Sequence, residues 1–470
     1  MLDFLKNSGI FFFGNVLSKV IVFFMLPIYT NYIPPADYGL YDLSMTYIII
    51  LTAVLYFDIW QSVQRFIFDF DEDSLKYRVI YSGWQIFGVC TIVYFLLGVI
   101  GYTFISLKYY WLIFAYGLAL CIQHMYTSAI RGFQKNTLYA ISGVVNTLTT
   151  VVLNILFIVF LGLDYSSLYI ASICGSVSQI LILERELKVF KGFSLKRNKE
   201  QKSQMLKYAL PLCLNSVSYW LLTSFNRIVI SQRMSYDDNG IYAIGNKFGS
   251  IIYLVTTCFT LAWQDMSFSH GYGKKDDSGF YSKACSLYTK FNYLGFSLVL
   301  PVFYIVFPFL VNEAYDAARQ TIPLFLLVTI LSTYSTFMSN IFYAIKDTRP
   351  AFTSMAVSVV LNFALCYPLI DWWGLNGANL SILISFFLNI VIRYWILKRK
   401  INLRLDIKQS LLAFVLIGAS MAVYQLGGLS GNLIWFFMVA AVAIFLLKDE
   451  LMKIITSLKG KPSPDEMSPN

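Results

Sequence analysis

The sequence predicts an all-α integral membrane protein with about 14 transmembrane helices, arranged as two pseudo-symmetric six-helix lobes and a C-terminal helix pair. Three observations support this fold class. Long apolar segments recur from end to end, positive charge gathers on alternate connections, and sequence motifs repeat after about 200 residues.

The apolar segments account for nearly the whole chain. Of the 470 residues, 57% are hydrophobic and only 13% are charged, about half the charged fraction of a soluble protein. Apolar residues run continuously and do not alternate with polar ones, which indicates helices and not barrel strands. The expected spans are 9–32, 40–60, 79–103, 110–130, 138–162, 166–187, 208–232, 240–266, 286–311, 321–345, 351–370, 375–397, 410–427 and 432–447.

The net charge of +10 is distributed unevenly over the connections between these spans. If the N-terminus is inside, the outer loops hold only Lys108, Arg233 and Arg319, and most of the 36 Lys and Arg residues lie in inner segments. This is the positive-inside rule, and it predicts that both termini are cytoplasmic. Because no basic stretch belongs to a folded soluble module, we expect no nucleic-acid partner.

Three ordered matches indicate a duplicated multi-helix unit. They are Asn15-x-x-Ser18 with Asn215-x-x-Ser218, Asp37-x-Gly39-Leu40-Tyr41 with Asp238-x-Gly240-Ile241-Tyr242, and Val151-Val-Leu-Asn154 with Val359-Val-Leu-Asn362. The repeat predicts an N-terminal lobe (1–187), a basic cytoplasmic linker (188–207) and a C-terminal lobe (208–398). An extra helix pair (399–447) and a polar cytoplasmic tail (448–470) follow.

The sequence carries no sign of catalysis. It has no GxxxxGK[ST] phosphate loop, and its cysteines are scattered through the spans without metal-ligand spacing. We interpret His124 as a packed side chain and His270 as solvated at an inner helix end. The outer loops are too short for a catalytic domain, so we expect a non-enzyme without cofactor or metal.

Embedded charges are the strongest site candidates, because a cation at the bilayer centre costs about 2.5–3.5 kcal/mol on insertion scales. Lys290 and Arg393 lie near inner helix ends and are expected to snorkel. The remaining four cations lie on the leading helix pair of each lobe and are predicted to bind substrate: Lys19, Arg65, Arg227 and Lys247. Snorkelling or a local ion pair is the alternative interpretation of each.

Lys19 is the deepest of these cations, about 15 Å into its span. It shares a helix face with Asn15 and Ser18. Span seven has a matching polar stripe of Asn215, Ser218, Tyr219, Leu222 and Asn226. We expect the two faces to point at one another across a central cleft.

The embedded acids are Asp42, Asp58 and Asp265. Asp58 and Asp265 could neutralise Arg65 or Lys247 as structural pairs. Alternatively, one acid could bind a coupling proton or sodium ion, since burial can tune a carboxylate to titrate near neutrality. A cleft with several cations, few acids and many tyrosines suits a phosphate-bearing, hydroxyl-rich ligand.

The segments Gly14–Lys19, Pro27–Tyr32 and Asp37–Tyr41 resemble the start of bacterial polysaccharide flippases, and Tyr367-Pro368 and Gly374–Ala378 strengthen the resemblance. These are the O-antigen and capsule repeat-unit flippases of the multidrug/oligosaccharidyl-lipid/polysaccharide exporter superfamily. The resemblance implies alternating access of a cation-lined cavity in the bacterial cytoplasmic (inner) membrane. It also implies an undecaprenyl-diphosphate-linked oligosaccharide as substrate, with a polysaccharide polymerase and glycosyltransferases as partners.

Two rival functions remain open at this point. One is a multidrug or organic-cation antiporter on the same fold, although span one lacks the acidic cluster that such exporters use. The other is a membrane-embedded polymerase or glycosyltransferase, against which the short outer loops count.

Overall fold

The structure is a computed structural model that describes residues 20–189, 198–270, 277–345 and 347–448. Within these ranges the regular structure is helical, and no strand occurs. Ten described helices are long and apolar enough to cross a membrane. A helix pairs every backbone polar group within its own segment, which is what a hydrocarbon environment requires. The all-α membrane fold is thereby confirmed.

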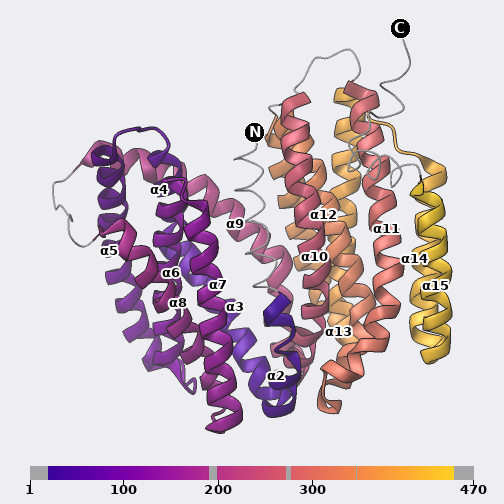
Figure 1. Ribbon diagram of the computed structural model, residues 1–470, viewed down its shortest axis with the longest axis horizontal. Helices are drawn as coiled ribbons and strands as arrows, with labels where there is room; N and C mark the ends of the chain where they lie inside the picture. The colour runs from indigo at the N-terminus through magenta and orange to yellow at the C-terminus, as the bar shows by residue number, and fades with distance from the viewer. Residues whose placement is uncertain (1–19, 190–197, 271–276, 346, 449–470) are drawn as a thin grey trace. The chain divides into compact units, whose positions relative to one another are not determined.

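The first half of the chain forms a helical bundle (Figure 1). Its elements are α2 (Leu26–Tyr32), α3 (Pro35–Tyr56), α4 (Ile59–Ile67), α5 (Asp73–Phe104), α6 (Tyr110–Gly132), α7 (Asn136–Ile155), the π-helical turn η1 (Leu156–Phe160) and α8 (Ser166–Leu187). The surface of this bundle is strongly apolar, with Val89, Phe104 and Phe160 at 63%, 83% and 74% exposure. Such a surface suits contact with lipid and not with water.

The second half begins with two helices of 35 residues each. Its elements are α9 (Lys199–Arg233), α10 (Tyr236–His270), α11 (Asp277–Leu310), the 3₁₀ segment η3 (Glu313–Thr321), α12 (Ile322–Ala344), α13 (Arg349–Ile401), α14 (Ile407–Leu426) and α15 (Gly428–Leu446). Each of the fourteen expected spans overlaps at least one described helix, and residues 9–19 of the first span lie outside the described residues.

Several helices are interrupted inside the apolar region. Span two divides into α3 and α4 at Phe57 and Asp58, which both have left-handed backbone angles (φ 53° and 48°). Pro27 occupies the first turn of α2, directly after a turn at Phe24–Met25 that interrupts span one. In α13 the two spans are separated at Gly374, whose φ of 56° suits glycine.

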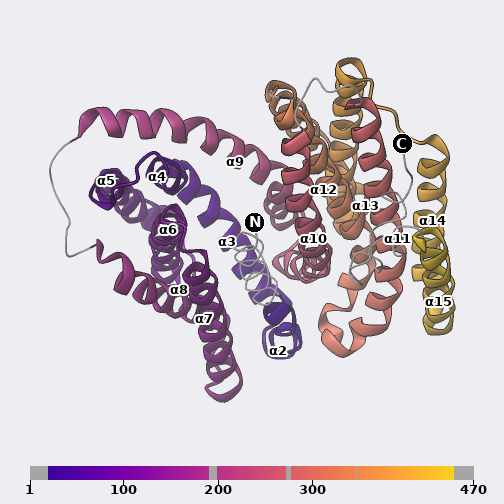
Figure 2. The ribbon, with the colours of Figure 1, turned by 45° about the horizontal axis from the view of Figure 1, so that its top comes forward.

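The chain divides into two compact units. Unit 1 contains residues 1–269 and 310–393, and unit 2 contains residues 270–309 and 394–470. In unit 2, α11 packs against α14 and α15 through Leu294, Ala413 and Ala443. In unit 1, α9 runs along the first-half bundle, where it contacts α3, α4 and α5 (Figure 2).

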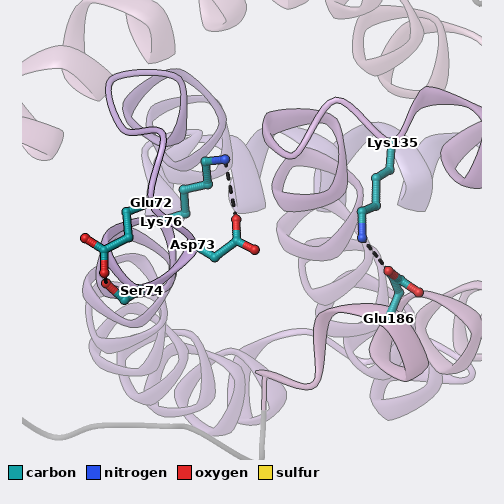
Figure 3. Close-up of polar contacts among 6 residues, drawn as sticks. All are labelled: Glu72, Asp73, Ser74, Lys76, Lys135 and Glu186. Atoms are coloured by element: carbon teal, nitrogen blue, oxygen red, sulfur yellow. Dashed lines mark hydrogen bonds and ion pairs between the residues drawn. The ribbon is translucent and has the colours of Figure 1, made fainter.

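Polar contacts join helix ends on the side of the first-half bundle that is predicted to be cytoplasmic (Figure 3). Lys135, between α6 and α7, pairs with Glu186 near the end of α8. On α5, Lys76 pairs with Asp73 at 3.5 Å. The pair of Lys135 with Glu186 joins neighbouring helix ends, whereas the pair of Lys76 with Asp73 lies within α5. Ion pairs at the surface contribute little stability individually.

Repeat-related residues occupy equivalent structural positions, which supports the predicted pseudo-symmetry. Asn154 on α7 donates to the hydroxyl of Tyr29 at 3.0 Å, and Asn362 on α13 donates to Oδ1 of Asn226 at 3.1 Å. Each asparagine therefore ties the fifth helix of its lobe to the first. The Asp-x-Gly-x-Tyr motif and its repeat form a contact between the lobes, which is described below.

Candidate functional site

The central feature of unit 1 is an ion pair between the two halves of the repeat. Nε of Arg227 on α9 lies 2.9 Å from Oδ2 of Asp42 on α3, and both side chains are largely buried. Neither atom makes a well-aligned hydrogen bond, so the contact is electrostatic. Lys247 on α10 interacts electrostatically with both residues. These three side chains carry a net positive charge.

Arg227 also lines a cavity of about 350 Å³ formed by α9, α10, α12 and α13. The wall is rich in groups that can hydrogen-bond to sugars, among them Thr223, Asn246 and Thr329. Tyr242, the repeat counterpart of Tyr41, packs against Phe325 with the ring centroids 4.6 Å apart and the planes tilted by 52°, and both rings line the cavity. The cavity thus combines one guanidinium with a hydroxyl-rich and aromatic wall.

A second cavity of about 780 Å³ shares Tyr219, Ser332 and Phe386 with the first. Along α12 its wall carries a stripe of hydroxyl groups at helical spacing, formed by Ser332, Ser335, Thr336, Ser339 and Tyr343. The serine and threonine hydroxyls that donate to backbone carbonyls of the preceding turn can still accept further hydrogen bonds. Because the cavities adjoin, Arg227 lies at one end of a long polar path. This hydroxyl stripe was not predicted from the sequence, although the helical spacing of its residues could have revealed it.

Arg393 borders the second cavity but does not snorkel, so that expectation was wrong. It is 3% exposed and donates to Oγ of Ser354, to Oγ of Ser339 and to both oxygens of Ser335. A further hydrogen bond reaches the carbonyl oxygen of Ala351. Arg393 therefore ties α12 and both halves of α13 together. The position of Arg393 near an inner helix end did not predict its burial, because neighbouring helices supply hydrogen-bond acceptors at that depth.

The other predicted cations are placed differently. Arg65 pairs with the exposed Asp69 at 2.5 Å near the end of α4, which corresponds to the alternative interpretation of a local ion pair. Lys19, Asn15 and Ser18 lie outside the described residues. The side chains of Asn215 and Asp265 are also outside the part that the structure describes.

The polar stripe predicted on span seven does not face a single cleft. Tyr219 lines both cavities, and Ser218 donates to the carbonyl of Leu214. Leu222 and Asn226 are instead fully buried. Asn226 donates to Ala378 and Ser381 of α13, because α9 packs its own lobe on this side.

The acids and the histidine have local partners. Asp58 accepts a hydrogen bond from Gln61 at 3.2 Å, and Arg65 pairs with Asp69, so the proposed Asp58–Arg65 pair is absent. The acid that does neutralise an embedded cation is Asp42. His124 stacks on Trp60 with ring centroids 5.0 Å apart, which confirms a packed side chain. Within the described residues no group of three or more His, Cys, Asp or Glu could hold a metal ion.

The Asp-x-Gly-x-Tyr motif and its repeat meet directly beside the ion pair. A Cβ atom on Gly39 would lie 1.8 Å from the carbonyl oxygen of Tyr236, and one on Gly240 would lie 2.1 Å from that of Pro35. Asn239 donates to the carbonyl of Gly39 at 2.8 Å. Only glycine permits this backbone approach. Together with Tyr315, which donates to the carbonyl of Ile33, these residues close the two lobes on the side predicted to be outer.

Two known protein families match parts of this chain. Residues 4–263 match the family described as polysaccharide biosynthesis protein, and residues 301–446 match the family described as lipid II flippase MurJ. No curated protein matches the chain.

Solved structures show the same fold. A structure of the lipid II flippase MurJ in an inward closed conformation has a TM-score of 0.72 at 12% identity, over 94% of this chain and 99% of that chain. An inward-facing multidrug resistance MATE family transporter of the MOP superfamily has a TM-score of 0.62 at 14% identity, over 86% and 95%. Its outward-facing counterpart has a TM-score of 0.55 at 16% identity, over 85% and 95%.

The fold is shared with the lipid II flippase MurJ and with MATE transporters of the MOP superfamily, and the last third of the chain matches the MurJ family model. The chain belongs to the polysaccharide biosynthesis protein family, whose match covers more than half of it. The resemblance seen in the sequence is thereby confirmed, and so is the prediction of a transporter and not an enzyme.

Proposed function

We propose that this protein moves undecaprenyl-diphosphate-linked oligosaccharide repeat units from the inner to the outer leaflet of the bacterial cytoplasmic membrane. Transport would serve the synthesis of O-antigen, capsule or exopolysaccharide. The observation that carries the proposal is Arg227, a mostly buried guanidinium that lines a hydroxyl-rich cavity. Its Nε has no aligned acceptor within the described residues, and its one hydrogen bond there, to Oγ of Ser224, is long at 3.5 Å.

The diphosphate binds at Arg227 and Lys247, because these cations have only Asp42 as a neighbouring counterion among the described residues. Arginine and lysine bind phosphate through charge-assisted hydrogen bonds. Lys19 contributes a further positive charge in this proposal. Arg65, in its ion pair with Asp69, binds substrate only if that pair opens.

The sugars lie along the hydroxyl stripe of α12 and against Tyr219 and Phe386, where aromatic faces cover sugar rings. The prenyl chain stays in lipid. Phosphate competes with Asp42 for Arg227, and release of Asp42 weakens the link between α3 and α9. The glycine contact at Gly39 and Gly240 can then separate and open the site outward, as alternating access requires. Asp42 would thereby link substrate binding to opening, while coupling to a proton or sodium ion stays open for Asp42, Asp58 and Asp265.

The test is polysaccharide output from cells in which the chain is the sole flippase for that polymer. We expect Arg227→Gln and Lys19→Ala each to lower output at least about tenfold, because each removes a charge-assisted contact with phosphate. Membrane abundance should stay near that of the wild type. Arg233→Gln, at an exposed outer position, serves as the matched control. Wild-type output from Arg227→Gln would refute the assignment.

Multidrug or organic-cation antiport is the second candidate, since MATE transporters share the fold. The positive charge of Arg227 and Lys247 disfavours a cationic substrate. Drug resistance conferred by the wild-type chain, with no effect on polysaccharide output, would favour the antiporter.

A further inference from the structure

A third cavity, of about 680 Å³, lies away from the site described above, between α5, α9 and the break after α3. It shares no residue with the two cavities near Arg227. Its walls combine basic and apolar side chains: Phe57, Gln85, Ile86, Val89, Cys90, Lys199, Lys202, Ser203, Leu206, Lys207 and Leu210. We call it the α5–α9 groove.

The contribution of α9 to the groove is a single helix face that changes character along its length. Lys199, Lys202 and Ser203 occupy its first turns, and Leu206 and Leu210 follow at the same helical spacing. From residue 199 to residue 210 the face is about 16 Å long. The face is cationic and polar at its start and combines Lys207 with the apolar Leu206 and Leu210 further on, which suits an amphipathic ligand.

The groove is fixed in place by hydrogen bonds on its closed side. Ser82 on α5 donates to Oε1 of Gln201 at 2.8 Å, and Ser62 on α4 donates to the carbonyl of Met205 at 2.9 Å. On its open side Val89 is 63% exposed and Leu210 is 50% exposed. These apolar side chains belong to the surface that faces lipid, so the groove is accessible from the bilayer.

Charge in the groove is of one sign. No acidic residue lines it, and within the described residues no ion pair involves Lys199, Lys202 or Lys207. The three lysines lie within the segment 188–207, which the charge distribution predicts to be a cytoplasmic linker. Basic pockets between helices on that side of a membrane suit anionic headgroups.

We propose that the α5–α9 groove binds an anionic phospholipid of the cytoplasmic leaflet. Its phosphate lies among Lys199, Lys202 and Lys207, and an acyl chain runs along Leu206, Leu210 and Val89. A zwitterionic lipid would bring a second, positive group among three lysines and is therefore disfavoured. A lipid in this position contacts both α5 and α9 and so holds the first-half bundle against the helix that leads to Arg227.

The test is native mass spectrometry of the purified full chain with phosphatidylglycerol and, separately, phosphatidylcholine. We expect phosphatidylglycerol to bind preferentially to the wild type. The triple variant K199Q/K202Q/K207Q should need at least about tenfold more phosphatidylglycerol for half occupancy, since each lysine near an anionic headgroup contributes about fivefold.

The matched control is K398Q/R399Q/K408Q, which removes three exposed cations outside the groove. It should bind phosphatidylglycerol like the wild type. Should the triple variant fail to fold, Lys202→Gln alone should show an approximately fivefold loss. Equal loss in the control, no loss in the groove variants, or displacement of the lipid by equimolar glycerol 3-phosphate would each overturn the proposal. Because the readout is lipid binding and not transport, it stands or falls independently of the flippase proposal.

Discussion

Two arginines of the second half of the chain, Arg227 and Arg393, lie in apolar helices beside adjoining cavities, yet their surroundings differ. Arg393 uses Nε and both terminal nitrogens in five hydrogen bonds within its own lobe. Arg227 has an unaligned contact with Asp42 from the other lobe and a 3.5 Å contact with Ser224. A buried cation costs free energy unless its donors are satisfied. The comparison shows that the donors of Arg393 are satisfied within the fold, whereas Arg227 keeps an unpartnered Nε, as the proposed diphosphate site requires.

The largest effect is expected from removal of Arg393, the arginine whose hydrogen bonds stabilise the fold. Arg393→Ala leaves several buried acceptors of α12 and α13 without a donor, which should cost at least about 3 kcal/mol. We expect low membrane abundance and a melting temperature in detergent lowered by several degrees. Arg227→Gln should melt close to the wild type. Similar losses of stability in both variants would remove the distinction between the two arginines.

A second test concerns the counterion of Arg227. Asp42→Asn leaves the guanidinium without its acid, and we expect a stability loss of about 1–3 kcal/mol together with reduced transport. The double variant D42N/R227Q should recover part of the stability, because the unpaired guanidinium is gone and only Lys247 remains without Asp42, but it should not recover transport. Recovery of both would show that the pair is purely structural. Thermal melting and polysaccharide output measure the two effects separately.

The contact between the repeat motifs offers a third test. Gly39→Ala introduces a Cβ that would overlap the Tyr236 carbonyl, so the two lobes cannot close at this point. We expect a several-fold increase in labelling of Ile33→Cys, a buried position beside Tyr315, by an impermeant maleimide added outside. Gly88→Ala is the matched control, since nothing lies within 4 Å of its added Cβ. Equal labelling in the two backgrounds would argue against a role of Gly39 in closure.

The smallest expected effect lies in a loop outside the membrane. Partial burial acts to raise the pKa of Asp164, but hydrogen bonds from Lys108, Tyr109 and Ser166 outweigh it and hold the pKa well below 3.8. A carboxylate with a lowered pKa stabilises the fold above its unfolded-state pKa, and this stability is lost as the pH falls through the folded-state value. Asp164→Asn should therefore cost about 1 kcal/mol or less at neutral pH, and melting below about pH 4 should depend less on pH than in the wild type. A variant that melts like the wild type at every pH would contradict this role.

The fold could be predicted largely from the sequence, because membrane spans follow from hydropathy. The repeat was visible in Asp37–Tyr41 and Asp238–Tyr242, and its structural meaning is the contact of Gly39 with Gly240. Helix breaks were harder to predict. Phe57 is not a glycine, yet it adopts a left-handed conformation, so its residue type gave no signal of the break.

The site could be predicted only in part. Arg227, Lys247 and Asp42 were recognisable as charges in apolar spans, but the pairing of Asp42 with Arg227 was not, since it joins helices far apart in the sequence. Arg393 was misassigned because acceptors from α12 are invisible in its own helix. The hydroxyl stripe of Ser332, Ser335 and Ser339 was visible as a pattern, but its cavity required the tertiary structure.

The most direct measurement of the central claim is the affinity of the purified full chain for undecaprenyl diphosphate. Arg227→Gln should weaken binding about tenfold or more, as expected for a charge-assisted hydrogen bond lost from a largely buried site. Arg233→Gln, which alters only an exposed arginine, should bind like the wild type. If Arg227→Gln and the wild type bind undecaprenyl diphosphate equally, Arg227 does not hold the diphosphate and the account is contradicted.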